Sequence, residues 1–385
     1  MAKKMDKKSP NVPNLRFPGF EGEWDIVHLG DLCDKIGDGI HSTPKYNDFG
    51  DYSFINGNNF VEGKIVISES TKRVTKAEAE KHNAHTLTEN TILLSINGTI
   101  GSLALYNGES VMLGKSACYI NPPKTQNRLF IFYQLSANRI NNYFISELTG
   151  STIKNLSLKS IRNTILYLPA NKEQKKIAKF FSFLDKRIST QSKIIEDLKL
   201  LKSTLRHNIF TDLDNSNVEI KLIKDVLNYE QPTNYIISNT NYQNDPILIP
   251  VLTANKAFIL GYTSDKDGIY NKGNCIIFDD FTMDLKYVDF PFKVKSSAIK
   301  ILTPRPKVSL KYIFEYLSFL NLVSSNHKRH YISEVESMPI SVPKLYMQNI
   351  FANLFSAVDK KIESESNYHN LLLLQKQYLL NHIFI

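Results

Sequence analysis

The sequence predicts an α+β protein of two similar lobes, each built from mixed strands and helices and each followed by one long helix. The first observation is an internal repeat, in which residues 342–384 repeat residues 168–210 without a gap, at a constant offset of 174. About 15 of the 43 positions are identical. The second observation is that a pattern of short strands and loops starts over after residue 217. Together they predict the order lobe, helix, lobe, helix.

Both copies of the repeat have the pattern of a long helix. Pro169 and Pro343 open the two copies, where a missing N–H costs least, and no later proline or glycine interrupts either. Apolar residues recur at alternating steps of three and four, which is typical of a coiled-coil seam. The predicted seam consists of Leu184, Ile188, Ile195, Leu198, Leu205 and Ile209 in the first copy and Val358, Ile362, Leu372, Leu379 and Ile383 in the second.

Two like helices can close on each other about a pseudo-twofold axis, so we predict an antiparallel coiled coil. Complementary polar layers would fix its register at some cost in stability. The predicted register sets three pairs opposite each other: Ile188 and Leu379, Lys202 and Glu365, and Gln191 and Lys376. The alternative is that each helix simply lies on its own lobe.

The composition indicates a folded protein with more than one core. Hydrophobic residues make up 42% of the 385 residues and aromatic residues 11%, which is too rich for a disordered chain and too long for one ordinary domain. Lys and Arg total 47 against 38 Asp and Glu, a net charge of +9. This modest excess favours a polyanion as partner without establishing one.

Cysteine spacing and the lack of long apolar runs indicate the cellular compartment in which we expect the protein. Cys33, Cys118 and Cys275 have no CxxC spacing, so neither a disulfide framework nor a zinc site is indicated. The N-terminal lysines are not followed by an apolar run, and no stretch reaches the ~18 apolar residues of a membrane span. We therefore expect a cytoplasmic protein that does not enter a membrane.

The pattern divides the chain into five segments. Prolines and glycines oppose regular structure in the N-terminal arm, although Phe17, Phe20 and Trp24 suggest that it is pinned to a surface. The predicted segments are the arm (1–23), the first lobe (24–167), the central helix (168–212), the second lobe (213–341) and the distal helix (342–385). Predicted strands are 61–67, 91–96, 115–120, 165–168, 275–278 and 295–301, predicted helices are 129–143 and 310–322, and 211–217 is a predicted linker.

Short catalytic patterns occur, but none of them occurs in both halves. Residues 108–116 end in Gly-Lys-Ser with five residues rather than four between the glycines, so a phosphate-binding loop is not indicated. Residues 121–124 carry Lys124 where amino-methyltransferases place an aromatic ring. Carboxylates near Glu62 and Asp279 give no repeated nuclease pattern, and the nine histidines show no metal-ligand spacing. A binding protein with no catalytic residue and no metal site is therefore favoured.

Several short patterns mark the starts of the lobes and helices. They are Pro-Asn-Leu-Arg-Phe-Pro-Gly-Phe at 13–20 with Trp24, Leu-Gly-Asp at 29–31 with Ser-Thr-Pro at 42–44, and Pro169, Gln174, Ala178, Asp185, Lys186 and Ile188 with their second copies. Together they resemble the specificity (S, HsdS) subunit of type I restriction-modification enzymes. The resemblance spans essentially the whole chain, strongly in the helices and weakly within the lobes. One departure is that the distal copy has Met347 where the first has Glu173.

The resemblance implies that the lobes are two target-recognition domains, each reading one half of a split DNA site. The helices would act as a spacer and dock two modification subunits. Those subunits carry S-adenosylmethionine and methylate adenine, and restriction (motor-nuclease) subunits use ATP and magnesium, so this chain would hold no cofactor and would not be an enzyme. About 27 helical residues span ~40 Å, close to the ~34 Å of one turn of B-DNA, so helix length would set the gap in the site.

Reading DNA requires side chains that reach base edges and groups that hold phosphates. In the first lobe, the predicted contacts are His41, Ser42, Thr43, Lys45, Tyr46, Asn58, Asn59, Asn97, Thr99, Ser151, Thr152 and Lys154. In the second lobe, they are Thr253, Asn255, Lys256, Thr282, Lys286, Ser296, Lys328, Arg329 and His330. For each of them, an ordinary exposed loop residue is the alternative. Phe180, Phe183 and Leu201 on the helix are candidates to receive the modification subunits.

Two other classes of function stay open. The first is a nuclease or methyltransferase that works alone on DNA, which would show chemistry without partner proteins. The second is a scaffold whose lobes bind protein, for which no duplex would bind at any salt concentration. The bases recognised cannot be predicted, because loop contacts and DNA shape set them.

Overall fold

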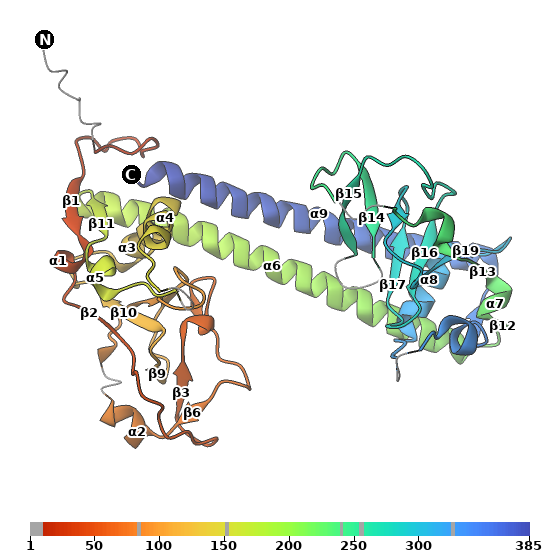
Figure 1. Cartoon of the computed structure of the whole chain (residues 1–385), viewed down its shortest axis with the longest axis horizontal. Helices are drawn as coiled ribbons and strands as arrows, with labels where there is room; N and C mark the ends of the chain where they lie inside the picture. The colour runs from red at the N-terminus through yellow and green to blue at the C-terminus, as the bar shows by residue number, and fades with distance from the viewer. Residues whose placement is uncertain (1–10, 83–85, 151–153, 239–241, 254–257, 325–327) are drawn as a thin grey trace, which may run out of the picture. The chain divides into compact units, whose positions relative to one another are not determined.

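The computed structural model describes residues 11–82, 86–150, 154–238, 242–253, 258–324 and 328–385 (Figure 1). The chain forms two compact units. Unit 1 comprises residues 1–191 and 368–385, and unit 2 comprises residues 192–367. Each unit therefore contains one lobe and one end of each of the two long helices.

The first lobe contains two main sheets. A four-stranded antiparallel sheet has the order β2-β10-β7-β8, and a three-stranded sheet has the order β6-β3-β9, in which β3 and β9 are parallel. The strands are β1 (Asp25–His28), β2 (Lys35–Asp38), β3 (Tyr52–Ile55), β4 (Phe60–Val61), β5 (Lys64–Ile65), β6 (Arg73–Val74), β7 (Ile92–Ser95), β8 (Leu103–Leu105), β9 (Val111–Leu113), β10 (Ala117–Asn121) and β11 (Ile165–Leu168). The helices are α1 (Leu29–Leu32), η1 (Gly57–Asn59), α2 (Lys76–Lys81), α3 (Arg128–Leu135), α4 (Asn138–Ser146) and α5 (Leu158–Arg162).

The second lobe repeats the strand order of these two main sheets. Its sheets have the orders β13-β19-β16-β17 and β15-β14-β18, with β14 and β18 parallel. The strands are β12 (Glu219–Leu222), β13 (Leu227–Glu230), β14 (Ile249–Leu252), β15 (Ile259–Thr263), β16 (Cys275–Asp279), β17 (Leu285–Val288), β18 (Lys293–Val294), β19 (Ile299–Pro304) and β20 (Pro339–Val342). The helices are α7 (Ile223–Val226), η3 (Pro232–Tyr235), α8 (Leu310–Phe319) and η4 (Tyr331–Val335). The predicted duplication of an α+β lobe is confirmed.

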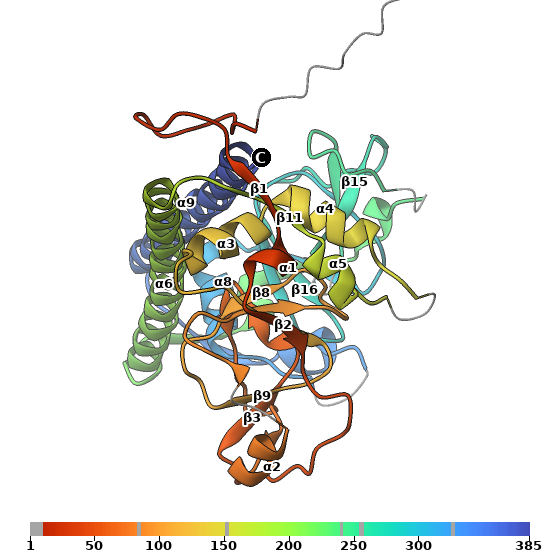
Figure 2. The same ribbon diagram turned by 90° about the vertical axis from the view of Figure 1, so that its left-hand side faces the viewer.

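Each lobe is closed by a strand pair next to its long helix. β1 pairs antiparallel with β11, and β12 pairs antiparallel with β20. In the first lobe, α3 is tied to this pair because Gln134 Nε2 donates to the carbonyl of Tyr167 (2.9 Å). Figure 2 shows α1, α3 and α5 gathered around β1 and β11. The core beneath them includes Trp24, Phe130 and Phe144, each at most 2% exposed.

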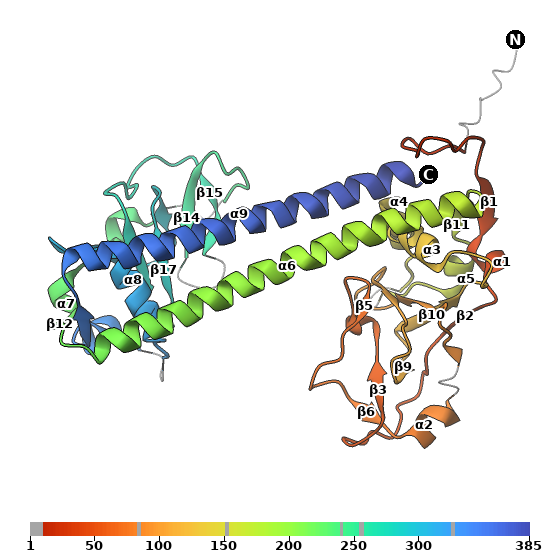
Figure 3. The same cartoon turned by 180° about the vertical axis from the view of Figure 1, so that it is seen from behind.

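The long helices are α6 (Asn171–Asp214) and α9 (Leu345–Ile383). In unit 1, the start of α6 lies against the end of α9, where Phe181 stacks on Phe384 with ring centroids 5.7 Å apart (Figure 3). In unit 2, Phe210 near the end of α6 stacks on Phe355 near the start of α9 at 6.1 Å. The helices therefore run antiparallel in both units, as predicted.

The predicted register of the helix pair is wrong. Lys202 Nζ lies 2.6 Å from a carboxylate oxygen of Asp359, not opposite Glu365. Lys376 Nζ likewise lies 2.6 Å from Asp185 instead of Gln191. A heptad seam fits several registers, and the stacked phenylalanines with these charge pairs select the observed one. The seam residues listed above are partly or fully buried in this arrangement.

Four predicted elements differ locally, and one of them is the strand expected at 295–301, which lies at Ile299–Pro304 as β19. The helix expected at 129–143 is broken into α3 and α4, because Ala137 is extended and caps α4. The linker expected from residue 211 begins later, since the hydroxyls of Tyr316 and Ser341 donate to Asp214 at the end of α6. The strand expected at 61–67 is the hairpin β4–β5, which turns at Glu62 and Gly63, both with positive φ.

The N-terminal arm is fastened to both long helices within unit 1. Arg16 donates to both carboxylate oxygens of Glu173 on α6, at 2.8 Å each. Leu15 N–H donates to the carbonyl of His382 on α9 (2.8 Å). Phe17 packs edge-on against Phe180 at 5.5 Å. The arm is thus held by the aromatic contact expected from the sequence and by the Arg16–Glu173 ion pair. Glu173 in the first copy of the repeat therefore binds this arm.

Candidate DNA interface

Four predicted contacts of the first lobe are brought close together. Asn58 is on η1, Asn97 and Thr99 are in the turn between β7 and β8, and Lys154 begins the segment leading to α5. With its amide nitrogen facing the acceptors, Asn97 donates to the carbonyl of Lys154 (3.2 Å) and to Asn155 Oδ1 (2.7 Å). A Cβ on Gly98 would lie 3.7 Å from Asn58 Oδ1, so η1 adjoins the same turn. Asn58, Thr99 and Lys154 are exposed.

A polar network beneath these residues holds their loops in place. Ser95 Oγ lies 3.1 Å from Thr99 Oγ1 and donates to the carbonyl of Asn97 at 3.1 Å. Gly57 approaches so closely that a Cβ there would lie 1.9 Å from Ser95 Oγ. Gly57 N–H donates to Ser116 Oγ (3.1 Å). These bonds fix the turn and η1 from within, so the exposed side chains of Asn58 and Lys154 are held at a defined place on the surface.

The loop between β2 and β3 forms a second exposed group. His41, Ser42, Thr43, Lys45 and Tyr46 are all exposed there. His41 Nε2 lies 2.8 Å from Asp38 Oδ2, and Lys72 Nζ sits 4.4 Å above the ring of Tyr46. A cation over an exposed ring presents both a positive charge and a flat apolar surface, which suits a nucleic acid.

Asn59 has a structural role. Its Oδ1 accepts from Asn56 N–H (2.9 Å), and its Nδ2 donates to the carbonyl of Val66 (2.9 Å). These bonds use its amide to shape η1 and the hairpin that follows. Its predicted contact with DNA is therefore less well supported than that of Asn58.

The predicted DNA contacts of the second lobe differ in how exposed their side chains are. Thr282, Ser296, Lys328 and Arg329 are exposed. Lys286 is half-buried, with its Nζ 6.0 Å above the ring of Phe258. The remaining described candidates of this lobe are His330 and Thr253.

His330 and Thr253 are buried, at 0% and 8% exposed, so this structure does not present their side chains on the surface for the predicted contact. Asp280, itself 1% exposed, accepts the backbone N–H of His330 at Oδ1 (3.1 Å), and its other oxygen lies 3.5 Å from Lys300 Nζ. These contacts hold the backbone of His330 in the core, and its ring Nδ1 lies 3.0 Å from Glu334 Oε2. Four other candidates, Ser151, Thr152, Asn255 and Lys256, lie outside the described residues.

Two exposed turn tips were missed by sequence reasoning. Phe49 is 97% exposed and Ile247 is 91% exposed, the highest values among the large hydrophobic residues of the described ranges. Phe49 N–H donates to Asn47 Oδ1 (2.9 Å), and Ile247 N–H donates to Asp245 Oδ1 (3.1 Å). Both tips precede equivalent strands, β3 and β14. The sequence signal that could have indicated these turns is an Asn or Asp two residues before the exposed apolar residue.

Residues of the short catalytic patterns make contacts within their own lobes. Asp279 Oδ1 accepts the N–H groups of Phe281 and Thr282, and Asp280 binds Lys300. Ser116 Oγ donates to Asn56 Oδ1 (2.9 Å). Within the described residues, no group of three or more His, Cys, Asp or Glu is placed to hold a metal ion. Nor does any helix in the same ranges have the length and apolar character to cross a membrane.

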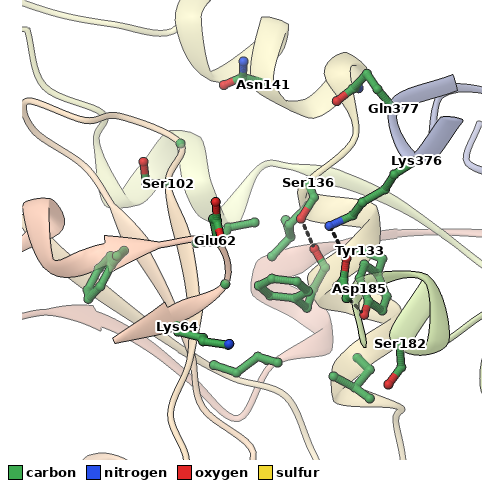
Figure 4. Close-up of a pocket in the computed structure, with 18 of the residues that line it drawn as sticks. Glu62, Lys64, Ser102, Tyr133, Ser136, Asn141, Ser182, Asp185, Lys376 and Gln377 are labelled. Atoms are coloured by element: carbon green, nitrogen blue, oxygen red, sulfur yellow. Dashed lines mark hydrogen bonds and ion pairs between the residues drawn. The ribbon is translucent and has the colours of Figure 1, made fainter. Parts of the chain in front are cut away.

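A cavity of about 630 Å³ opens in unit 1 between the β4–β5 hairpin, α3 and the two long helices (Figure 4). Glu62 and Lys64 line one side, and Tyr133, Asp185 and Lys376 line the other. Tyr133 OH donates to Asp185 Oδ2 (2.8 Å), and Lys376 Nζ lies 2.6 Å from Asp185 Oδ1. Burial, with the nearby Asp185 carboxylate, raises the pKa of Tyr133, so its hydroxyl keeps the proton it donates.

Comparison with known families identifies the class of protein. A family model described as "Type I restriction modification DNA specificity domain" matches residues 21–200 and again 215–373. Each match covers one lobe and part of the long helix that follows. The chain therefore belongs to the type I restriction-modification DNA specificity family, with two such domains, as the sequence resemblance implied.

Individual relatives agree with this family. The EcoR124I/EcoR124II specificity subunit of Escherichia coli is 44% identical over 137 residues, covering 34% of each chain. The MjaIX specificity subunit of Methanocaldococcus jannaschii is 24% identical over 213 residues, covering 54% of this chain and 49% of the relative. The chain thus spans less than half the length of these relatives. The crystal structure of the S subunit of a type I system from M. genitalium matches 97% of this chain and 99% of its own with a TM-score of 0.61 at 16% identity, so the fold is shared.

Proposed function

We propose that this chain is the DNA-specificity subunit of a type I restriction-modification complex and that each lobe reads one half of a split DNA site. The observation that carries this proposal is the double match to the specificity domain, once on each lobe. The two lobes share their strand order while their loops differ. A shared scaffold with different loops suits two binding surfaces of the same kind that read different bases.

The exposed clusters supply the chemistry for DNA contact. Asn58 and Thr99 offer an amide and a hydroxyl to base edges, and Lys154 beside them offers a charge to phosphate. In the second lobe, Lys328 and Arg329 supply positive charge, although Lys328 Nζ is also 2.7 Å from Glu334. We propose that these residues contact DNA, with the amide and hydroxyl groups setting sequence and the charged groups setting affinity.

We propose that two modification subunits dock on the long helices. Leu200 and Leu374 are equivalent positions of the repeat, and they are 67% and 68% exposed. Phe183 and Leu201 are also exposed, at 60% and 48%. Equal apolar sites at equivalent positions suit two copies of one partner. Phe180 does not belong to this surface, since it packs under Phe17 of the arm.

The proposal assigns the chemistry to the partners. The modification subunits would bring S-adenosylmethionine and methylate adenine, the restriction subunits would use ATP and magnesium, and this cytoplasmic chain would hold no cofactor. The described residues supply amide, hydroxyl and ammonium groups that can bind DNA. The spacer role of the helices is part of the same proposal.

The test is to express the chain with and without its modification subunits and to supply duplex DNA with S-adenosylmethionine. We expect salt-dependent DNA binding, and methyl transfer only when the modification subunits are present. Methyl transfer or magnesium-dependent cleavage by the chain alone would instead favour an enzyme that works by itself. A chain that binds no duplex at any salt concentration, with or without the partners, would favour a protein-binding scaffold.

A further inference from the structure

The two lobes contact their long helices at equivalent places. In unit 1, the amide of Gln174 accepts from Asn127 N–H (3.4 Å) and donates to the carbonyl of Pro169 (2.9 Å). In unit 2, the amide of Gln348 accepts from Ser309 N–H (2.9 Å) and donates to the carbonyl of Pro343 (2.8 Å). Asn127 and Ser309 are therefore equivalent N-caps of α3 and α8. Counting from these caps makes Tyr133 equivalent to Glu315 and Leu129 equivalent to Lys311.

The junction in unit 1 is largely apolar around one charge pair. Asp185 receives the hydroxyl of Tyr133 and the ammonium of Lys376 (Figure 4). Leu380, one turn further along α9, is 3% exposed and belongs to the same core as Tyr133. Leu129 packs against that core from α3.

The junction in unit 2 has the equivalent aspartate–lysine pair, but further charged side chains surround this pair. Lys202 and Lys311 each lie 2.6 Å from Asp359. Glu315, with a fully buried side chain, lies 3.0 Å from Lys202, 2.9 Å from Lys311 and 2.6 Å from Arg206. Burial works to raise the pKa of Glu315, but Lys202 and Lys311 outweigh it and hold this pKa below its ordinary value.

The differences between the junctions are matched across the interface. Arg206 and Leu380 are equivalent positions of the repeat, just as Glu315 and Tyr133 are equivalent positions of the lobes. Arg206 donates to Glu315 on α8, whereas Leu380 and Tyr133 on α3 belong to one apolar core. A change on the lobe is thus accompanied by a complementary change on the helix.

We propose that these matched sets are an address that assigns each lobe to its own end of the helix pair. The set of unit 1 is Leu129, Tyr133 and Leu380, and the set of unit 2 is Lys311, Glu315 and Arg206. The shared aspartate and lysine hold either lobe, whereas the address discriminates between them. The inference concerns assembly of the chain and does not depend on DNA reading.

The address works through the penalty for a mismatch. If α8 docked at the unit 1 end, Glu315 would keep lysine neighbours, but the buried oxygen that Arg206 binds would face Leu380 and lose both guanidinium bonds. If α3 docked at the unit 2 end, Arg206 would face the phenol of Tyr133 and lose its carboxylate. A buried charge without its partner is strongly unfavourable, so the repeated helices can share much of their sequence without accepting the wrong lobe.

The test transplants one address into the other unit of the full-length chain. Glu315→Tyr leaves Lys202, Lys311 and Arg206 with Asp359 as their one carboxylate, and Arg206→Leu removes both guanidinium bonds from a buried oxygen of Glu315. We therefore expect each variant to lower Tm by about 6 °C or more. We also expect each to speed amide hydrogen exchange in α8. The triple variant R206L/K311L/E315Y rebuilds the unit 1 set around Lys202 and Asp359 and should recover most of both losses. Lys199→Leu, at an exposed position of α6, is the control for a lost charge.

The reverse transplant is tested in unit 1 in the same way. Tyr133→Glu alone should lower Tm and speed exchange in α3, and the triple variant L129K/Y133E/L380R should recover most of that loss. Recovery in both triple variants supports the address. A triple variant that is no more stable than its worst single variant, or single variants indistinguishable from Lys199→Leu, would overturn it.

Discussion

Asp185 binds Lys376 in unit 1, and Asp359 binds Lys202 in an equivalent contact in unit 2. Asp359 is the repeat copy of Asp185, and Lys202 is the repeat counterpart of Lys376. Both pairs have the same separation of 2.6 Å, and the two aspartates are 35% and 37% exposed. The repeat is therefore complementary to itself when its two copies run antiparallel. This explains why the shared residues include both an aspartate and a lysine.

Charge reversal tests this pairing. We expect Asp185→Lys to destabilise unit 1 by about 1–2 kcal/mol, because it places two ammonium groups together at a half-exposed site. The double variant D185K/K376D restores an opposite pair and should regain most of this loss, as judged by urea unfolding. An additive loss in the double variant would show that the two side chains do not interact.

The arm gives a second prediction. Glu173 is 1% exposed and is bound by Arg16, so Arg16→Met should cost roughly 3–5 kcal/mol by leaving a buried carboxylate unpaired. The distal copy has Met347 at the position of Glu173. The double variant R16M/E173M places a methionine at position 173, as the distal copy does. It should recover most of the lost free energy of unfolding, as measured in urea. Lys175→Met, on the exposed side of α6, is the matched control, and a double variant no better than Arg16→Met would contradict this explanation.

The charged junction of unit 2 predicts a dependence of stability on pH. Burial opposes ionisation of Glu315 and Asp359, but their lysine partners outweigh it and lower both pKa values from the ordinary 4.5 and 3.8. A lowered pKa in the folded state means that the unfolded state takes up protons first as the pH falls. The stabilisation is therefore complete above the ordinary pKa values and is lost as pH falls through the lower folded-state values.

Chemical unfolding across acidic pH measures this effect. Between about pH 5 and 3, the wild-type chain should lose stability more steeply than Glu315→Gln, which has no proton to take up at that site. Glu363→Gln on the exposed face of α9 should keep the wild-type slope. Equal slopes for all three chains would show that Glu315 does not contribute.

The turn tips give a prediction about binding without a change in stability. Phe49 and Ile247 are almost fully exposed, so replacing either with Ala should alter the free energy of unfolding by less than about 0.5 kcal/mol. Phe49 follows Lys45 and Tyr46 in the same exposed loop, and Lys72 lies over the ring of Tyr46. We expect Phe49→Ala to weaken duplex binding about tenfold through a lost contact with the bases. No lysine or arginine occurs within eight residues of Ile247 in the sequence, so Ile247→Ala should have the smaller effect. Unchanged affinity in a stable Phe49→Ala chain would remove the tip from the interface.

The architecture could be predicted because the repeat is long and self-complementary. Two lobes, two helices and their antiparallel direction all follow from residues 168–210 and their copy. The register could not be predicted, because it depends on Phe384 stacking on Phe181 and on a lobe residue, Tyr133, that binds Asp185. These contacts join parts of the chain that are far apart in sequence.

The candidate DNA contacts were only partly predictable. Polar loop composition pointed to Asn58, Asn97, Thr99 and Lys154, which the fold brings together. The same reasoning included His330, whose burial depends on a distant carboxylate, Asp280. Exposure is set by tertiary packing, so residue type alone cannot separate a binding histidine from a core one.

The central claim is that each lobe reads its own half of the DNA site. The most direct measurement is methylation-sensitive sequencing of DNA modified by the whole complex carrying Thr99→Ala in the first lobe or Arg329→Ala in the second. The account predicts that Thr99→Ala relaxes or weakens recognition in one half of the site and Arg329→Ala in the other, with the gap between the halves unchanged. If both variants altered the same half, or if folded complexes carrying them modified DNA exactly as the wild type does, the account would be contradicted.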